Sequence, residues 1–411
     1  MHAHLTFTGF LGKHLHLGVT GSVAAYKALE LVRLWRAAGV RVSATLTKSA
    51  KKFVTPLSFS ALGADPVHTG MFPSGQNPAQ NVFAHLEPGN KADAFVIAPA
   101  TANCLAKLAF GLADDMLSCQ ALAFPKPLVV APAMNPGLWE AQATRENRQR
   151  LKRRGMVCIE PGIGDTACGD QGQGRLADLE TIYLQGLKAL SSQDMAGVKV
   201  LVALGPTREP WDGVRFWSNP SSGLMGASLA VSAWLRGAEV SAVCGPTAIW
   251  LPHGIHRMDV STAKEMYAAC LDLWPSQEIA CLAAAVSDFS PKPRSGGKFK
   301  KSQAKKGGLR IEFEQTPDIL STLGGLKTKK QRLIGFAAET ENLQENAKEK
   351  LSAKNLDLVV ANNVAKAESG FKVPTNQVLV MDNKGRGEEW PLLQKTEVAW
   401  RIWDWTLQLY T

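Results

Sequence analysis

The sequence predicts an α/β protein built from two doubly wound, mostly parallel-sheet domains. Short apolar runs alternate with segments of helical periodicity along the whole chain, which is typical of parallel sheets. A polar, glycine-bearing stretch, LSSQDMAG (190–197), interrupts this alternation once, near the middle. The chain has 411 residues and is 45% hydrophobic, enough for two cores, since domains usually contain about 100–200 residues. We therefore expect one domain at 1–190 and a second at 191–411.

The first half begins with a βαβ unit. HLHLGVTGSVAAYKALELVRLWRAAGVRVSATLT (14–47) predicts a short strand, a small-residue turn, a helix from about Val23 to Ala38 and a strand from Val40. ADAFVIAPATANCLAKLAFGLADDMLSCQALA (92–123) repeats this order, with a buried strand that ends at Ala98. KPLVVAPAMNPGLWEAQATRENRQRLKRRG (126–155) repeats it again.

The second half starts a fresh βαβ unit. VKVLVAL (198–204) predicts a buried parallel strand, and a helix and another strand follow from Leu224. Between them lies GPTREPWDGVRFWSNPSSGLMG (205–226), which is too glycine-rich for a core helix and too irregular for a strand. We expect an oversized loop at the carboxyl end of a strand, where open α/β sheets bind ligands. Three later apolar runs continue the domain: EIACLAAAVSDF (278–289), QRLIGFAAET (331–340) and LDLVVANN (356–363).

Charge and cysteine content limit the environment of the protein. Seven cysteines form no CxxC pair, so neither a zinc site nor a disulfide framework is indicated, and a reducing cytoplasm fits best. No segment predicts a secretion signal or a membrane span. The net charge is +10, and residues 292–310 contain eight lysines or arginines without an acid. This run is either a solvated loop or a grip on polyphosphate or nucleic acid.

Small residues follow three strands of the first half. GVTGSVAAYK (18–27), APATAN (98–103) and APAMNP (131–136) would meet at one edge of a parallel sheet. Backbone N–H groups at a helix start can there approach a phosphate. Tight turns that need small residues explain the first stretch equally well, so the residues alone predict only one planar or phosphorylated ligand.

Four motifs carry a resemblance. TGSVAAYK, IAPATANCLAKLAFGLADDML, APAMNPGLW and ACGDQGQGRLAD, in this order, resemble the decarboxylase half of the bifunctional phosphopantothenoylcysteine decarboxylase and phosphopantothenate–cysteine ligase family. The match spans about residues 13–185 and implies a flavodoxin-like fold that binds flavin mononucleotide (FMN). It implies that FMN contacts Gly21, Ser22, Val23, Ala24, Pro99, Ala100 and Thr101.

The same resemblance assigns three catalytic residues. His85 would act as a base or position the substrate, Asn135 would bind the substrate carboxylate, and Cys168 would reprotonate the intermediate from a flap. The chain departs from the family at Leu138, where methionine is usual, and at Leu176, where methionine again is common. Both changes keep apolar bulk, so we expect altered packing and retained activity.

The stretch at 205–226 resembles the signature loop of the ligase half, and this second match runs from about 198 to 405. It implies activation of phosphopantothenate by CTP with Mg²⁺, followed by attack of cysteine on the acyl-cytidylate. Arg215 and Asn219 would hold that intermediate, and Lys298 would be the catalytic lysine. Further nucleotide contacts fall on Asp288, Pro317, Asp318, Ile319, Leu320, Phe336, Lys350 and Lys354. Pro220 and Leu224 replace the histidine and lysine common in the family, which removes one cation.

Two other classes stay open on the residues alone. An NAD(P)-dependent reductase would need GxGxxG followed by an acid about 20 residues later, which neither half supplies cleanly. A basic nucleic-acid-binding flavoprotein would use the run at 292–310. The resemblance instead implies small-molecule partners, no nucleic acid and no membrane. It also implies a homo-oligomer with trimeric flavoprotein halves and dimeric ligase halves, possibly a dodecamer. Preference for CTP over ATP and the metal-contacting residues are not predicted, and we expect the first dozen residues to be disordered.

Overall fold

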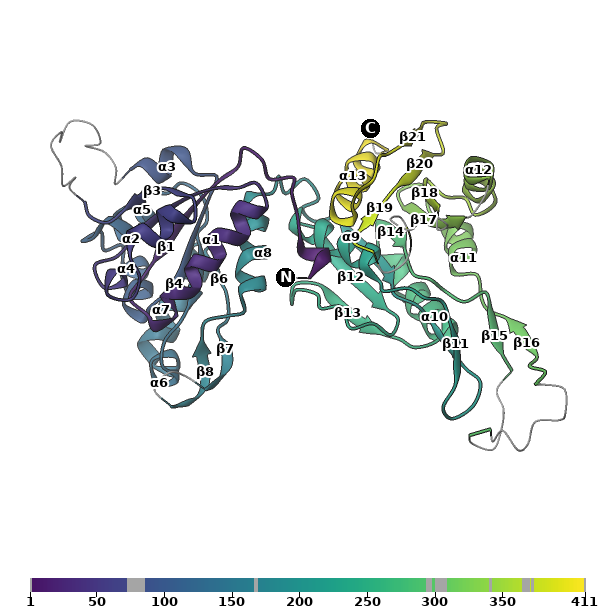
Figure 1. Ribbon diagram of the computed structural model, residues 1–411, viewed down its shortest axis with the longest axis horizontal. Helices are drawn as coiled ribbons and strands as arrows, with labels where there is room; N and C mark the ends of the chain where they lie inside the picture. Colours follow the sequence, from purple (N-terminus) through teal and green to yellow (C-terminus); the bar gives the residue numbers. More distant parts are fainter. Residues whose placement is uncertain are drawn as a thin grey trace. The chain divides into compact units, whose positions relative to one another are not determined.

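The computed structural model describes residues 2–71, 86–165, 169–292, 298–299, 309–339, 342–363, 370 and 373–409. The chain divides into two compact units (Figure 1). The N-terminal unit is Phe7–Ser192, and the C-terminal unit combines Met1–Thr6 with Gln193–Thr411. Among the described residues, no helix combines the length and apolar character that a membrane crossing requires.

The N-terminal unit alternates strands and helices as the sequence predicts. Its strands are β1 (His14–Val19), β2 (Arg41–Leu46), β3 (Ala64–His68), β4 (Ala94–Ala100), β5 (Val129–Pro132), β6 (Val157–Cys158), β7 (Gly162–Asp165) and β8 (Gln171–Arg175). Its helices are η2 (Val23–Tyr26), α1 (Lys27–Ala37), η3 (Ala50–Lys52), α2 (Pro56–Ala61), α3 (Glu87–Lys91), α4 (Ala102–Phe110), α5 (Met116–Ala123), α6 (Pro136–Glu140), α7 (Gln142–Arg153) and α8 (Leu179–Leu190).

Six parallel strands form one sheet in the order β3-β2-β1-β4-β5-β6. Successive strand residues point to opposite faces, so Phe95 and Ile97 of β4 pack against α4, α5 and α7. Helices α1 and α8 pack side by side on the other face (Figure 1). The direction of winding reverses between β1 and β4, and this switch point is where doubly wound sheets bind ligands.

The C-terminal unit contains a larger sheet and three two-stranded ribbons. Its strands are β9 (Lys199–Leu204), β10 (Arg208–Pro210), β11 (Phe216–Ser218), β12 (Glu239–Cys244), β13 (His256–Asp259), β14 (Ile279–Leu282), β15 (Phe289–Pro291), β16 (Phe313–Gln315), β17 (Arg332–Glu339), β18 (Leu358–Asn363), β19 (Thr375–Asn376), β20 (Val378–Asp382), β21 (Gly387–Glu389) and β22 (Leu393–Gln394). Its helices are η1 (Ala3–Leu5), α9 (Leu224–Leu235), α10 (Ala263–Leu273), η5 (Trp274–Ser276), α11 (Ile319–Leu326), α12 (Leu343–Ala353) and α13 (Lys395–Gln408).

The large sheet has the order β13-β12-β9-β14-β17-β18-β20-β21, and its first six strands are parallel. Counted along the chain, those six strands follow the same order as the sheet of the N-terminal unit. Residues of α10, α11 and α12 pack on one face, while α9 and α13 pack against each other on the other face. The switch point lies between β9 and β14. The expected α/β fold with doubly wound, mostly parallel sheets is confirmed.

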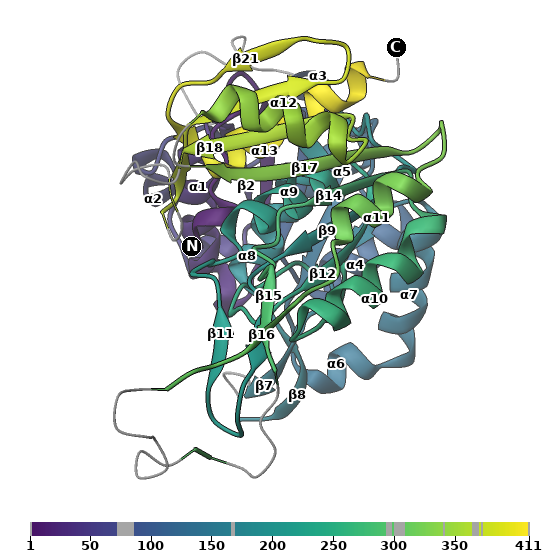
Figure 2. The same cartoon turned by 90° about the vertical axis from the view of Figure 1, so that its right-hand side faces the viewer.

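Two sequence expectations are wrong. The stretch at 205–226 is not a plain loop, because it contains the antiparallel pair β10–β11. This ribbon and the β15–β16 ribbon lie side by side and extend away from the large sheet (Figures 1 and 2). Residues 2–12, the described part of the first dozen, are not disordered: His4 and Leu5 are buried, and His4 Nε2 hydrogen-bonds to Trp250 O at 2.7 Å. Burial of Leu5 supplies the apolar contact that outweighs the conformational entropy of an ordered terminus.

Candidate active sites

The ends of β1 and β4 are joined at the switch point of the N-terminal unit. Thr20 Oγ1 donates to Pro99 O (2.7 Å) and accepts a hydrogen bond from Thr101 N (3.0 Å). Thr101 in turn caps α4, since its Oγ1 accepts from Cys104 N at 3.4 Å. Ser22 caps the short helix η2 in the same way, accepting from Ala24 N at 3.3 Å. Helix starts therefore meet at this edge of the sheet.

Two cavities lie at this edge, and five of the seven predicted cofactor residues line one or the other. One, of about 430 Å³, includes Gly21 and Thr101 in its lining, with Lys48, Ser49, Lys107 and Asp115. The other, of about 520 Å³, includes Ser22, Val23, Ala24 and Asn135, with Lys27, Asp165 and Arg175. Pro99 and Ala100 are buried within β4 and contribute backbone carbonyls: Pro99 O accepts from Thr20, and Ala100 O accepts from Ala133 N.

These residues fit a phosphorylated planar ligand. A Cβ on Gly21 would lie 2.3 Å from Ser49 Cβ, so only glycine allows the two loops to approach this closely. Lys107 Nζ lies 2.7 Å from Asp114 and 2.6 Å from Asp115. Partial burial alone would raise the pKa of the Asp115 carboxyl, but hydrogen bonds from Lys107 and Ser118 hold it below its ordinary value. Burial raises the pKa of the Cys104 thiol to about 12, so this cysteine is not a nucleophile at neutral pH.

Asn135 connects the 520 Å³ cavity to the β7–β8 hairpin. Its Oδ1 accepts from Gly137 N at 2.7 Å and caps α6, and its Nδ2 donates to the carboxylate of Asp170. Met134 N donates to Gly174 O of β8 at 2.9 Å. The side-chain amide of Asn135 is thus oriented by its own turn toward a carboxylate. His85 and Cys168, the other two predicted catalytic residues of this half, lie outside the described residues.

Asn219 lies at the switch point of the C-terminal unit. Its Nδ2 donates to Val286 O at 3.0 Å and contacts Ala285 O at 3.4 Å, just beyond the end of β14. Thr207 is fully buried beside it, and its Oγ1 accepts from Ser287 N at 3.1 Å. The stretch at 205–226, which follows β9, is therefore fixed to the segment that follows β14.

One carboxylate, that of Asp212, binds both Arg215 and the residue that follows Lys298. Arg215 NH1 donates to Asp212 Oδ2 (2.9 Å) and to Phe299 O (3.1 Å). Phe299 N donates to the same Asp212 oxygen at 3.0 Å, and Lys298, the residue before it, is exposed. Asp212 thus joins Arg215 to the backbone next to Lys298, more than 80 positions further along the sequence.

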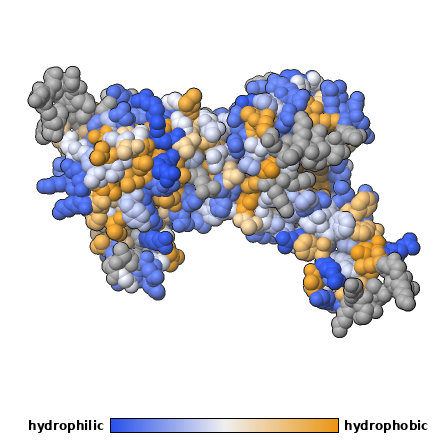
Figure 3. Space-filling model, viewed as in Figure 1, coloured by the Kyte–Doolittle hydropathy of each residue, from blue (hydrophilic) through white to orange (hydrophobic). Residues whose placement is uncertain are grey.

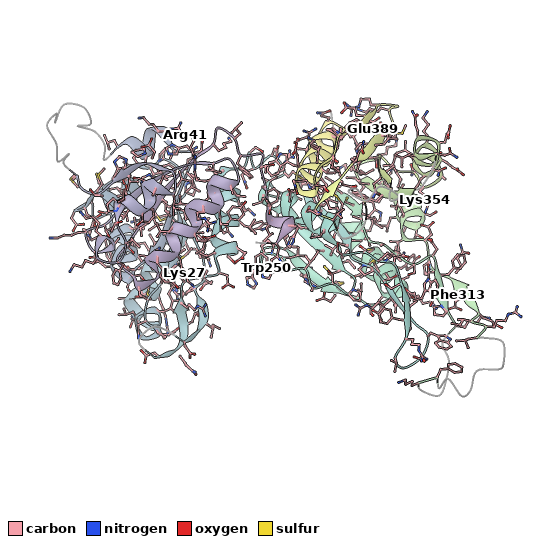
Figure 4. The ribbon with its side chains drawn as sticks, in the orientation of Figure 1. Lys27, Arg41, Trp250, Phe313, Lys354 and Glu389 are labelled. Carbon is pink, nitrogen blue, oxygen red and sulfur yellow. The ribbon has the colours of Figure 1, made fainter. Side chains whose placement is uncertain are left out.

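Four of the predicted nucleotide contacts are bonded to one another in two pairs. Lys354 Nζ pairs with Asp318 Oδ2 at 2.8 Å, and Lys350 Nζ donates to Phe336 O at 2.8 Å. Figure 4 labels Lys354 at the end of α12. Partial burial would raise the pKa of the Asp318 carboxyl, but hydrogen bonds from Lys354 and Ser321 N hold it below its ordinary value.

The remaining predicted contacts differ in exposure. Asp288 is exposed, and its backbone O accepts from Thr316 N at 3.0 Å, next to the partly buried Pro317. Ile319 and Leu320 are buried in the core cluster of the C-terminal unit. Their side chains are therefore turned away from solvent, and only their backbone at the start of α11 is available to a ligand. No cluster of three metal-ligating side chains occurs within the described part of the chain.

Sequence reasoning missed several residues that these contacts reveal. Lys48 and Lys107 line the 430 Å³ cavity, Asp170 contacts Asn135, and Asp212 joins Arg215 to Phe299. A signal existed for Asp212: aspartate followed by glycine is typical of a turn in which the side chain binds backbone N–H groups further along. Nothing comparable marks the lysines, because their neighbours become adjacent only when the sheet forms.

Comparisons with known proteins match a different family to each half of the chain. The Flavoprotein family matches residues 10–188, and the DNA/pantothenate metabolism flavoprotein C-terminal domain family matches residues 195–410. The chain is 40% identical to the coenzyme A biosynthesis bifunctional protein CoaBC of Bacillus subtilis over 394 residues, which is 95% of each chain. It is also 40% identical to the protein of that name from Escherichia coli K12 over 366 residues, 89% of each chain.

Two solved structures are similar to the separate halves. The C-terminal domain of a coenzyme A biosynthesis bifunctional protein CoaBC covers 53% of this chain and 98% of its own, with 38% identity and a TM-score of 0.45. A cysteine-to-serine variant of PPC decarboxylase complexed with pantothenoylaminoethenethiol covers 42% of this chain and 95% of its own, with 34% identity and a TM-score of 0.38.

Fold and sites define a two-unit α/β enzyme in which each unit has a doubly wound sheet with candidate site residues at its switch point, the first unit being a flavoprotein. The chain belongs to the family of coenzyme A biosynthesis bifunctional proteins. It is thus a bifunctional enzyme of coenzyme A biosynthesis with decarboxylase and ligase activities. These relationships do not favour the reductase or the nucleic-acid-binding alternative.

Proposed function

We propose that the C-terminal unit joins 4'-phosphopantothenate to cysteine with CTP, through an acyl-cytidylate, and that the N-terminal unit decarboxylates the product to 4'-phosphopantetheine with FMN. The observation that carries this proposal is the gathering of candidate groups at both switch points. Asn219 is bonded to the residues after β14, and Asn135 lies in a cavity with the start of η2. Both positions are where doubly wound sheets hold ligands.

In the decarboxylase, the start of η2 and the end of β4 would hold FMN, which when bound supplies oxidation of the substrate thiol and so a sink for the electrons left by CO₂. Gly21, Ser22, Val23 and Ala24 would line the site of its phosphate, with Lys48 as counter-charge, because Lys107 already pairs with Asp114 and Asp115. Asn135 already donates to the Asp170 carboxylate, which supports a role for its amide in binding the substrate carboxylate. His85 would position the substrate and Cys168 would return a proton.

In the ligase, cations must hold a carboxylate against a triphosphate. Arg215 and Asn219 would hold the acyl-cytidylate, and Lys298 would neutralise charge that develops during acyl transfer. Lys350 and Lys354, one turn apart on α12 and its end, would face the nucleotide with Asp318 and the start of α11. Mg²⁺ would accompany CTP. Pro220 and Leu224 supply no cation, so the remaining lysines would take the larger share of the phosphate charge.

The test of the ligase assignment compares Lys298→Gln and Asn219→Asp with the unchanged chain. We expect both to abolish CTP-dependent ligation and to leave decarboxylation of supplied phosphopantothenoylcysteine intact, because the two sites are in separate units. Lys292→Gln is the matched control, since Lys292 is a nearby exposed lysine paired with Glu312 at 3.1 Å. It should keep ligation within about threefold. Retained ligation in both Lys298→Gln and Asn219→Asp would overturn the assignment.

We propose that the protein is a cytoplasmic homo-oligomer, with dimeric ligase halves and trimeric flavoprotein halves. The described cysteines are all free, which suits a reducing compartment. On the paired ribbons, Val214, Phe216, Trp217 and Phe289 each expose half or more of their surface, and Trp217 contacts Phe313 with ring centroids 5.2 Å apart. Figure 3 shows apolar residues on the part of the C-terminal unit that the β10–β11 and β15–β16 ribbons form. Exposed apolar patches of this kind often mark protein interfaces.

Sedimentation velocity tests the oligomer proposal. We expect the unchanged chain to sediment as an assembly larger than a trimer, and Trp217→Glu to reduce it to trimers by placing a charge in the ligase contact. Ile163→Glu, at a side chain that is 80% exposed on the N-terminal unit, serves as a charge control outside the ribbons. A monomer at every concentration would refute the proposal.

A further inference from the structure

The Asp212 carboxylate is a buried anchor in the C-terminal unit. Its side chain is 0% exposed, and its two oxygens bind different partners. Oδ1 accepts from the backbone N–H groups of Val214 (2.8 Å) and Arg215 (2.6 Å), which closes a local turn. Oδ2 accepts from Arg215 NH1 (2.9 Å) and from Phe299 N (3.0 Å), which reaches across the unit.

The long-range branch fixes two segments at once. Arg215 NH1 also donates to Phe299 O at 3.1 Å, so Asp212, Arg215 and the Phe299 backbone form a closed ring of hydrogen bonds. Trp211 packs against Phe299 with ring centroids 5.4 Å apart. Arg215 nevertheless leaves 48% of its side chain exposed, so its remaining donors are available to a ligand. Lys298, immediately before Phe299, is exposed as well.

We propose that Asp212 is a positioning residue of the ligase, which fixes Arg215 and the backbone of Lys298–Phe299 in one geometry. The inference rests on the proposed function, because it gives Arg215 and Lys298 their roles in acyl transfer. Asp212 acts through these two residues and contacts no substrate itself. Through Asp212, the 205–226 stretch that carries Arg215 is held to the backbone next to Lys298 in the basic run at 292–310.

The charge state of Asp212 agrees with this role. Burial would raise the pKa of its carboxyl, but hydrogen bonds from the backbone of Phe299, Arg215 and Val214, together with the Arg215 charge, bring that pKa to about 2. The group is therefore an anion at neutral pH. An anion can accept all four hydrogen bonds, whereas an amide cannot.

Asp212→Asn separates the two branches. The amide oxygen can still accept from the turn, while the NH₂ group would face Phe299 N–H and the Arg215 guanidinium, which are both donors. The hydrogen bonds of the turn are retained, and those from Asp212 to Phe299 N and to the Arg215 guanidinium are lost. Asp382 offers a matched control. It is 0% exposed, its Oδ1 accepts from Lys384 N (2.9 Å) and Arg386 N (3.0 Å), and its Oδ2 accepts from Arg386 Nε (2.6 Å) and Trp405 Nε1 (3.0 Å).

The experiment measures CTP-dependent ligation by the full chain, by Asp212→Asn and by Asp382→Asn, well below their melting temperatures. We expect Asp212→Asn to lower kcat about 10- to 100-fold, since small misplacement of reacting groups has effects of this size. The KM for CTP should change less than about threefold, because the candidate nucleotide contacts are held by other partners: Lys354 pairs with Asp318, and Lys350 donates to Phe336 O. Asp382→Asn should lose similar stability but keep kcat within about threefold.

Equal kcat values for the two variants would overturn the inference and leave the proposed function standing. A wild-type chain that forms no phosphopantothenoylcysteine with CTP or ATP would overturn the proposed function, and the inference with it. If Asp212→Asn does not fold, Asp212→Ser and Asp382→Ser replace the pair, because serine keeps a weaker turn bond and cannot reach Phe299. Decarboxylation, which takes place in the other unit, should be unchanged in all four variants.

Discussion

His16 illustrates how much a single buried residue in β1 depends on its neighbours. It is 0% exposed, and its two ring nitrogens share hydrogen bonds with the hydroxyls of Ser43 (2.7 Å) and Thr45 (3.0 Å) on β2. Burial, with smaller contributions from His68 and His14, holds the pKa of His16 well below its ordinary value. The ring is therefore neutral in the folded chain at neutral pH.

This lowered pKa predicts a loss of stability in acid. In the unfolded chain His16 takes up a proton below about pH 6.5, whereas the folded chain does not. The free energy of unfolding should thus fall by about 1.4 kcal/mol per pH unit below that point from this residue alone. Denaturation of the full chain between about pH 7.5 and 5.5 measures how the free energy of unfolding changes with pH. This dependence should become weaker in His16→Gln and stay the same in His253→Gln, since His253 is exposed. A slope unchanged in His16→Gln would contradict it.

At the same scale, the sequence predicted residue types better than residue contacts. Lys354, Lys350, Asp318 and Phe336 were assigned to one ligand, and they contact one another in two pairs, Lys354 with Asp318 and Lys350 with Phe336 O. Asp212 and Asp170 were not assigned, because their partners are 87 and 35 residues away in the sequence. Hydrogen bonds of such separation depend on the tertiary fold and leave no local pattern.

At the scale of elements, α9 lies unusually close to β9. A Cβ on Gly226 of α9 would lie 2.4 Å from Leu204 Cβ of β9. Gly226→Ala should therefore push the helix from the sheet and lower the free energy of unfolding by about 1–3 kcal/mol. Gly325→Ala in α11 is the matched control, since no atom lies within 4 Å of the added Cβ. There alanine should add about 0.5–1 kcal/mol. Urea denaturation measures the free energy of unfolding of both variants. Similar changes in Gly226→Ala and Gly325→Ala would disprove the packing argument.

Periodicity predicted the helices and strands of both sheets closely, because apolar runs of strand length are bounded by turns in each βαβ unit. The helix expected from Val23 is observed as η2 followed by α1, which ends at Ala37. The ribbon β10–β11 was missed because its strands have three residues each. It is stabilised by contacts such as Ser218 Oγ donating to Thr207 O at 2.7 Å, and these do not appear in a pattern of alternating hydrophobicity.

At the scale of the whole molecule, the chain passes twice between its units, after Thr6 and after Ser192. The sequence predicted one passage near 190. The first was missed because the N-terminal segment packs on distant elements: η1 contacts α9 and α13, and Thr396 Oγ1 donates to Thr6 O at 2.6 Å. Only the fold brings residues 390 positions apart into contact.

Leu5→Asp should therefore destabilise the C-terminal unit, although residue 5 precedes the N-terminal unit in the sequence. Leu5 is 0% exposed, and loss of such a side chain usually costs about 2–5 kcal/mol. Differential scanning calorimetry of the full chain should show one transition lowered by several degrees and the other unchanged. Leu11→Asp, at a side chain that is 87% exposed, should shift neither. A lowered transition that belongs to the N-terminal unit would contradict this expectation.

The position of η1 also sets an order of events during synthesis. Residues 3–5 leave the ribosome long before the surface that they bind is complete, because that surface includes α13, which is made about 390 residues later. At roughly 5–20 residues per second, that segment waits roughly 20–80 seconds, while the N-terminal unit has all of its own strands and can fold. Docking of η1 is therefore complete only after α13 has been made, and a nascent chain that stalls before α13 lacks the contacts between η1 and α13.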